Sequence, residues 1–175
     1  EGSPELKYMH ERRQSLGGYQ PARRPKAAPL EVPPLSAFET LLKASGEGRA
    51  LSTTMAFVRL LRKLCRDKQV GMYVVPIVPD ESRTFGMAGI FAEIGIYSHV
   101  GQLYTPQDAS QLMFYKEDQH GQILQEGINE AGAMCDWIAS ATSYSVHGTM
   151  TIPFYVFYSM FGFQRVGDLC WLAGD

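Results

Sequence analysis

Cysteine is scarce in this sequence of 175 residues, which has three cysteines at widely separated positions. Their odd number and the lack of any CxxC spacing argue against a disulfide framework or a structural zinc site, so we expect a reduced, cytoplasmic chain. No apolar run approaches the roughly 20 residues of a membrane span, and the opening stretch EGSPELKYMHERR has no apolar signal core. The sequence therefore predicts neither a membrane protein nor a secreted one.

An excess of charge of one sign is also missing. The 16 Lys and Arg residues and 18 Asp and Glu residues leave a net charge of −2, which gives no sign of general nucleic-acid affinity. The sum hides an asymmetry, because residues 1–75 carry 13 basic and 7 acidic side chains, whereas residues 76–175 carry 3 and 11. The acidic part is also the more apolar one. Burying a charge is costly, so carboxylates among hydrophobic residues there need a specific reason.

Several catalytic motifs are absent from the sequence, namely GxGxxG, the P-loop, GxSxG and HExxH. His10-Glu11 begins like a metalloprotease motif, but Gln14 stands where the second histidine would be. The remaining histidines are isolated among loop residues and are expected at the surface; they are His99, His120 and His147. These motifs and histidines therefore predict no metal site.

Proline marks the first part of the chain as an arm. Five prolines fall within residues 17–34, and each fixes its own backbone and biases the preceding residue toward an extended conformation. Residues 1–16 are very polar and have a weakly helical pattern, and residues 1–35 as a whole are predicted to form an extended, proline-rich linker arm, followed by a folded domain over residues 36–175. The arginines of the arm either bind an acidic partner or belong to a solvated strap on a neighbouring surface.

Two helices are predicted at the start of the domain. Ser36 and Glu39 have the spacing of a capping box, which favours a helix over 37–44. Ser52 precedes a longer helix that runs to about Asp67, with apolar residues on one face at helical spacing. The opposite face is mostly basic and carries Arg59, Arg62, Lys63 and Arg66. Such a face is either a docking surface or simply solvated.

Two short apolar runs, at 72–78 and 151–158, are typical of buried strands. Pro76 is awkward for a central strand because proline cannot donate a hydrogen bond. Between the two runs, residues 84–121 indicate a short helix followed by a loop. Residues 122–143 then indicate a long helix of small and apolar residues, packed on all sides. With a final helix after the second strand, this order predicts an α/β fold with a parallel sheet.

Asp80 and Glu81 directly follow the first predicted strand. Ligands of open α/β sheets bind at the carboxyl ends of strands, so two adjacent acids there are candidates for anchoring a proton or a polar substrate. The alternative is a helix N-terminus, in which Asp80 caps the helix and Glu81 interacts with its positive end.

Glu126 and Glu130 lie one turn apart on the predicted helix over 122–143. Such a pair is either a general acid/base pair or a metal site, although no third ligand has a clear spacing. Glu130 is followed by Ala-Gly-Ala-Met, and a carboxyl group deep in an apolar segment is expected to have a raised pKa and to hold a proton. The alternative is a carboxylate satisfied by neighbouring backbone groups or an arginine.

Tyr158 and Phe161 belong to an aromatic group that spans the end of the second strand and the start of the last helix. Aromatic residues at such a turn either stack on a planar heterocycle or simply pack in the core.

Five longer strings carry a family resemblance: VPDESRTFGMAGIFAEIGIYS, GQLYTPQD, YKEDQHGQILQEGINEAGA, ATSYS and IPFYVFYSMFGFQRVGDLCWLAGD. From about Thr53 to Asp175 the sequence resembles the homodimeric bacterial pyruvate dehydrogenases, which depend on thiamine diphosphate. The resemblance implies a transketolase-like architecture, in which this chain corresponds to a linker and part of the pyrimidine-binding domain, incomplete at its C-terminus.

The resemblance also implies cofactors and partners. The family decarboxylates pyruvate on thiamine diphosphate and passes the acetyl group to the lipoyl group of dihydrolipoyl acetyltransferase. The Mg²⁺ and diphosphate ligands would lie in a preceding N-terminal domain, and each active site would form between the subunits of a homodimer. No nucleic acid and no membrane is implied as a partner. The chain by itself is therefore expected to be inactive.

Residue roles follow from the matching motifs. Glu130, in GINE, matches the glutamate that hydrogen-bonds a pyrimidine nitrogen of the cofactor and promotes its imino tautomer. Phe161 matches the aromatic residue that packs on that ring, and Tyr158 matches a tyrosine near the substrate-derived intermediate. Asp80 and Glu81 match acids at the entrance of the active centre, whereas no role is implied for Glu126.

The sequence departs from the family pattern at two places. Ala92-Glu93 replaces a more basic pair, and residues 146–149 differ from the usual polar loop. Two alternatives to the decarboxylase segment stay open: a non-catalytic fragment or assembly module, and another transketolase-like enzyme that acts on a different 2-oxo acid or sugar.

Overall fold

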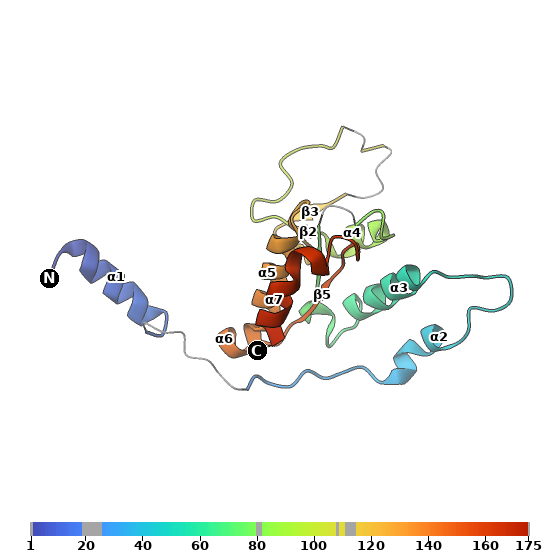
Figure 1. Cartoon of the computed structure of the whole chain (residues 1–175), viewed down its shortest axis with the longest axis horizontal. Coiled ribbons are helices and arrows are strands. Elements are labelled where there is room, and N and C mark those ends of the chain that lie inside the picture. The colour runs from blue at the N-terminus through green and yellow to red at the C-terminus, as the bar shows by residue number, and fades with distance from the viewer. Residues whose placement is uncertain (1, 19–25, 80–81, 108, 111–114, 175) are drawn as a thin grey trace.

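The structure is a computed structural model that describes residues 2–18, 26–79, 82–107, 109–110 and 115–174. Its α-helices are α1 (Pro4–Ser15), α2 (Glu39–Leu42), α3 (Thr53–Cys65), α4 (Ala88–Ile94), α5 (Glu130–Ala141), α6 (Ser143–His147) and α7 (Phe163–Gly174). Its strands are β1 (Val74–Val78), β2 (Ile96–Tyr97), β3 (Glu117–Asp118), β4 (Leu124–Gln125) and β5 (Ile152–Tyr155), and two 3₁₀ turns cover Leu35–Phe38 and Gly71–Tyr73. Helix α1 has no buried residue and is drawn apart from the sheet (Figure 1).

A three-stranded parallel sheet organises the domain, with the strands in the order β4-β1-β5. Helix α5 contacts all three strands, and α7 packs on α5. Strands β2 and β3 form a second, smaller parallel pair. The predicted fold class, an α/β domain with a parallel sheet flanked by helices, is confirmed.

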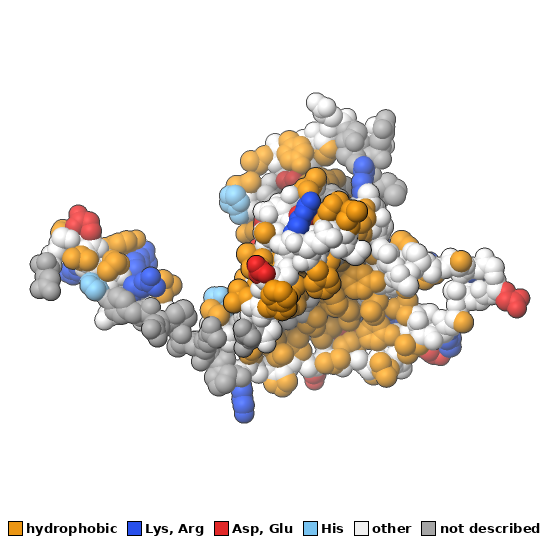
Figure 2. Space-filling model, viewed as in Figure 1, with side chains coloured by type: hydrophobic (Ala, Val, Ile, Leu, Met, Phe, Trp, Pro, Cys, Tyr) orange, Lys and Arg blue, Asp and Glu red, His pale blue; other side chains and the backbone are white. Residues whose placement is uncertain are grey.

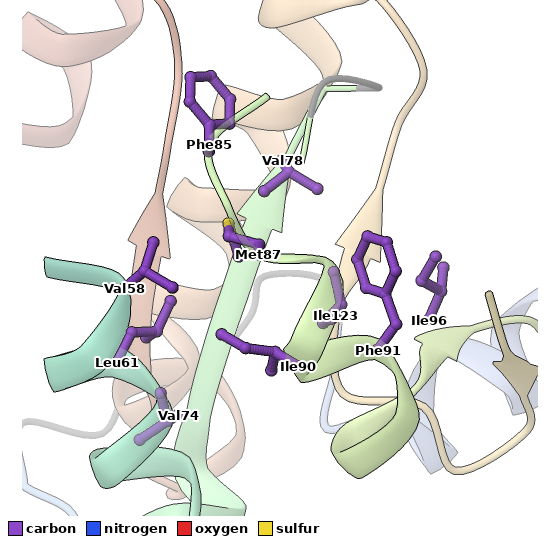
Figure 3. Packing of buried hydrophobic residues seen from close by; sticks show 10 residues of the cluster. All are labelled: Val58, Leu61, Val74, Val78, Phe85, Met87, Ile90, Phe91, Ile96 and Ile123. Carbon is purple, nitrogen blue, oxygen red and sulfur yellow. The ribbon is translucent and has the colours of Figure 1, made fainter. Parts of the chain in front are cut away.

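The principal hydrophobic core lies between β1 and the helices α3 and α4 (Figure 3). Val74 and Val78 lie four residues apart in β1, so the side chains of both point to the same face of the sheet. Leu61 of α3 and Ile90 of α4 meet them there, and both helix residues are fully buried. The apolar spacing predicted for α3 therefore identified its buried face, and the Ser52 side chain accepts a hydrogen bond from the N–H of Met55 at the start of that helix.

Pro76 does lie in the central strand, at a position where its missing N–H is not needed. The carbonyl of Ile77 accepts from Val156 on the β5 side, and that of Val78 accepts from Glu126 on the β4 side. Because the backbone groups of a strand alternate in direction, the nitrogen of Pro76 faces the β4 side. Strand β4 pairs only from Ile77 onward, so no acceptor of its ladder stands opposite the proline nitrogen.

The prediction of one helix over 122–143 is wrong for residues 122–129. Residues Leu124–Gln125 form β4, the third strand of the sheet, and the helix begins at Glu130. Gly127 has a φ of 73°, which turns the chain, and the Asn129 side chain caps the helix by accepting from the N–H of Gly132. Nor is α5 buried all round, since Cys135 is exposed.

Other boundaries also differ from the prediction. The helix expected over 37–44 is a 3₁₀ turn followed by the short helix α2, and Ser36 forms no capping hydrogen bond. The short strands β2 and β3 occupy parts of 84–121 in which no strand was predicted. The division between arm and domain at residue 35 stays a prediction. Among the described residues, no helix is long and apolar enough to cross a membrane.

Candidate functional site

The carboxyl ends of the three parallel strands meet at one edge of the sheet, where ligands of open α/β sheets bind. The chain reaches residues 82–85 after β1, Glu130 after β4, and Tyr158 and Phe161 after β5. Three segments that are distant in the sequence thus converge because their strands are parallel neighbours.

Glu130 is the first residue of α5, and its side chain is 8% exposed. Arg165, in the first turn of α7, donates from Nη1 to Oε1 of Glu130 at 2.7 Å. This hydrogen bond, together with a smaller contribution from the N–H of Glu130 itself, lowers the pKa of the Glu130 carboxyl despite the opposing effect of burial. The expectation of a raised pKa and a protonated carboxyl is therefore wrong for this chain, because a guanidinium compensates the carboxylate.

Arg165 also joins Glu130 to the aromatic residues. Its guanidinium carbon lies 4.6 Å from the ring centroid of Phe161, which is a cation–π contact. Phe161 is held in turn by the backbone of the β5–α7 turn, where its N–H donates to the carbonyl of Tyr158 at 2.9 Å. One arginine therefore connects two residues to which the sequence resemblance assigned a role at the same cofactor ring.

Tyr158 connects the turn after β5 to the segment after β1. Its hydroxyl donates to Oγ1 of Thr84 at 2.6 Å, and its ring lies 4.8 Å from that of Phe85 between centroids. The rings of Tyr158 and Phe161 meet edge to face, with centroids 6.5 Å apart. Tyr158 is 39% exposed, so its phenol is accessible at the edge of the sheet.

Three of the five predicted site residues thus form one continuous set of contacts: Glu130, Tyr158 and Phe161. Asp80 and Glu81 lie outside the described residues. Glu126 lies before the first residue of α5 and is therefore not part of that helix. The prediction of two carboxylates one helical turn apart is wrong. Glu126 instead interacts with Asp136, and burial together with this carboxylate raises the pKa of Asp136 to about 6.

Arg165 and Thr84 belong to this site but were not predicted from the sequence. The composition did contain a signal for the arginine, because it is one of only three basic residues among the 11 acidic side chains of 76–175. Thr84 gave no comparable signal, since its partner is 74 residues away in the chain.

The described histidines are all exposed, as predicted. Within the described ranges, no group of three or more His, Cys, Asp or Glu side chains is placed to hold a metal ion. Figure 2 shows hydrophobic side chains gathered in the lower middle of that view, between the places that α7 and α3 occupy in Figure 1.

Fold and site together define a class of protein. It is an α/β domain that carries a charge-compensated carboxylate and aromatic residues at the carboxyl edge of a parallel sheet. Residues 30–175 match the family described as the pyruvate dehydrogenase E1 component middle domain, so the chain belongs to that family.

Curated relatives agree with this membership. The chain is 70% identical over 175 residues to a pyruvate dehydrogenase E1 component of Cupriavidus necator and 61% identical over 175 residues to that of Pseudomonas aeruginosa. It is 56% identical over 176 aligned residues to that of Escherichia coli. All of the chain is covered in these comparisons, but it spans only 20% of the length of each relative.

The side chains at this edge of the sheet suit a planar nitrogen heterocycle. An ionised carboxylate such as that of Glu130 accepts a hydrogen bond from a protonated ring nitrogen. The ring of Phe161 is an aromatic surface of the kind on which a planar heterocycle stacks, and the guanidinium of Arg165 contacts it.

Proposed function

We propose that the chain is a segment of a pyruvate dehydrogenase E1 component. The whole enzyme would decarboxylate pyruvate with thiamine diphosphate and transfer the acetyl group to the lipoyl group of dihydrolipoyl acetyltransferase. The observation that carries this proposal is the nearly buried, ionised carboxylate of Glu130, joined to Phe161 through Arg165 at the carboxyl edge of the sheet. The family match and the names of the relatives support it.

Within that enzyme, Glu130 would hold a ring nitrogen of the pyrimidine by a hydrogen bond and would be the group that exchanges a proton with it. Arg165 keeps its carboxylate ionised and fixes its position, so that it is an acceptor near neutral pH. Thiamine diphosphate, when bound, supplies the electron sink for decarboxylation. Phe161 would pack on the pyrimidine ring and would exclude water from one side of it.

Tyr158 is assigned to the substrate side of the site, together with Asp80 and Glu81. The hydrogen bond from Tyr158 to Thr84 aims its hydroxyl toward the segment that follows β1, which is also the segment that carries the two acids. We assign the Mg²⁺ and diphosphate ligands to a preceding domain and the complete active site to a homodimer. A cytoplasmic location agrees with the scarcity of cysteine.

The test is Glu130→Gln in the full polypeptide that carries this chain. Amide substitution keeps the shape of the side chain but removes the ionised acceptor, so pyruvate decarboxylation should fall about 10²–10⁴-fold, the usual contribution of a positioned acid–base group. Release of carbon dioxide from pyruvate measures the rate. Circular dichroism checks that the fold is retained.

Glu126→Gln is the matched control and should keep the wild-type rate, because Glu126 has no assigned role in the reaction. Wild-type turnover by Glu130→Gln would refute the assignment. An enzyme that decarboxylates 2-oxoglutarate in preference to pyruvate would refute the substrate, and a chain without decarboxylase activity in its full polypeptide would favour the non-catalytic alternative.

Calorimetric titration of the 175-residue chain with thiamine diphosphate and Mg²⁺ tests whether the diphosphate and Mg²⁺ ligands lie outside this chain. Weak or no binding is expected if the diphosphate ligands lie elsewhere. Tight binding would contradict that assignment.

A further inference from the structure

Two neighbouring hollows lie beside Phe38, where the 3₁₀ turn Leu35–Phe38 and α2 approach α3. One has a volume of about 460 Å³ and is lined mainly by basic side chains. The other has a volume of about 580 Å³ and is lined mainly by apolar ones. Phe38 and Arg59 line both hollows, so the two are adjacent.

Two arginines of the basic hollow are held in place by one carboxylate. Nε of Arg62 donates to Glu93 at 2.8 Å, and Nε of Arg66 donates to the same side chain at 2.8 Å. A guanidinium has five N–H donors, so each arginine keeps donors beyond those that it gives to Glu93. Glu93 therefore fixes the orientation of both guanidinium groups without exhausting them.

The acid that lines the basic hollow is already engaged. The carboxylate of Asp67 accepts from the N–H groups of Gln69 at 2.8 Å and Val70 at 3.0 Å. These two hydrogen bonds lower the pKa of the Asp67 carboxyl, which stays ionised and turned toward its own backbone.

Two further cations of this hollow are uncommitted. Within the part of the chain that the structure describes, neither Arg59 nor Lys63 forms an ion pair. The Lys63 ammonium lies 5.8 Å from the ring centroid of Phe38, which leaves its three donors available. Four positive side chains thus stand against the two acids Asp67 and Glu93, an excess of two positive charges.

The neighbouring hollow is suited to an apolar group. Its lining includes Leu41, Leu42, Leu51, Phe57 and Leu60. Burying a hydrocarbon chain there is favourable in proportion to the area removed from water.

We propose that the two hollows form one binding site for a small amphipathic phosphate. The phosphate group lies among Arg59, Arg62, Lys63 and Arg66, and the apolar group extends past Phe38 into the leucine-lined hollow. A phosphate monoester is the anion of choice because its charge near −2 at neutral pH matches the local excess of two positive charges. Guanidinium groups also bind phosphate through paired donors. This site is separate from the carboxyl edge of the sheet and does not depend on the proposed function.

Calorimetric titration of the full polypeptide with octyl phosphate tests the site, with inorganic phosphate and octanoate as comparison ligands. Octyl phosphate should bind at least about tenfold more tightly than inorganic phosphate, because two buried CH₂ groups already supply that factor. It should also bind more tightly than octanoate, which carries one negative charge.

The double variant Arg59→Gln/Lys63→Gln should weaken octyl phosphate binding by at least about tenfold, the loss that follows from one charge-assisted hydrogen bond. Arg12→Gln/Arg13→Gln removes the same charge from α1 and should leave binding unchanged. Phe38→Ala should weaken binding of octyl phosphate while leaving that of inorganic phosphate unchanged.

Three results would overturn the proposal. Equal losses in the two double variants would mean general charge attraction, and equal affinities for octyl phosphate and inorganic phosphate would mean that no apolar part exists. No binding of octyl phosphate at 100 times the concentration of the protein would mean that the hollows are not accessible. Unchanged circular dichroism of each variant separates these results from a loss of the fold.

Discussion

Arg165 and Glu130 form an ion pair between the first turns of α7 and α5, with Nη1 and Oε1 2.7 Å apart. The arginine side chain is half exposed, whereas the glutamate side chain is 8% exposed. The pair therefore places a charged acceptor at the carboxyl edge of the sheet and supplies it with a counter-charge. A buried carboxylate without such a partner would be strongly destabilising.

The first prediction concerns Arg165→Gln, which should raise the pKa of the Glu130 carboxyl. The main cause of its lowered pKa is the hydrogen bond from Arg165. A depressed folded-state pKa contributes stability above the unfolded-state pKa, and this is lost as the pH falls through the folded-state value. Carbon-13 NMR titration of the Glu130 side chain measures the shift directly.

Arg165→Lys is the control for this titration, because it keeps the positive charge and one donor. It should leave the pKa of Glu130 closer to the wild-type value than Arg165→Gln does. The same titration midpoint in all three proteins would contradict the assigned cause.

The second prediction is that Asp136→Asn stabilises the chain above pH 6. Burial and the carboxylate of Glu126 raise the pKa of Asp136 to about 6. The folded state then binds the proton more tightly than the unfolded state, so wild-type stability falls as the pH rises from about 4 to about 6. Above this window, the variant should be more stable by about 1 kcal/mol after allowance for solvent screening.

Urea unfolding at pH 4 and at pH 7.5 measures this effect. The gain from Asp136→Asn should be present at pH 7.5 and small at pH 4. A gain of the same size at both pH values would show that the carboxyl charge is not its origin.

The third prediction concerns Glu93, which pairs with both Arg62 and Arg66 and so ties α4 to α3. The side chain of Glu93 is 22% exposed, less than either arginine. Glu93→Gln should lower the free energy of unfolding by about 0.5–1 kcal/mol. This is the upper part of the range measured for exposed ion pairs, and it is expected here because three charges form one network. The loss should shrink in 1 M salt.

Glu39→Gln provides the comparison, since Glu39 pairs with Lys43 and both side chains are largely exposed. Its effect should stay below about 0.5 kcal/mol. If both variants lose the same amount, the shared network around Glu93 adds nothing beyond an ordinary surface pair.

The fourth prediction tests the core between β1 and the helices. Leu61 is fully buried in it, so Leu61→Ala should cost about 2–5 kcal/mol through lost burial and a cavity. Leu103, which is 79% exposed, supplies the matched substitution Leu103→Ala, with an expected effect within about 0.5 kcal/mol. Urea unfolding compares the two, and similar losses would contradict the assigned core.

Two of the wrong expectations, the helix over 122–129 and the raised pKa of Glu130, have a common physical origin in contacts between residues that are distant in the sequence. The stretch 122–143 is apolar and poor in charge, and such composition does not distinguish a buried strand from a buried helix. Leu124–Gln125 form a strand because they pair in parallel with β1. Gly127 and Asn129 then place the start of the helix at Glu130. The pKa of Glu130 was misjudged because its partner Arg165 is 35 residues away.

The fold gives Glu93 a specific pair of partners. Glu93 meets Arg62 and Arg66, both from the helix predicted to have a basic face. Two of the four basic residues on that face are thus engaged by an acid from α4, which no spacing within α3 could reveal.

The α/β class, the buried face of α3 and the turn that carries Tyr158 and Phe161 could be predicted from the residues alone, because periodicity and turn residues are local properties. The tertiary structure alone decided the third strand, the place of Pro76 beside a short neighbour, and the contact from Arg165 to both Glu130 and Phe161. These depend on which strands become parallel neighbours. Scarcity of basic residues in 76–175 therefore acquires a specific meaning, since one of the three compensates the carboxylate on which the proposed function rests.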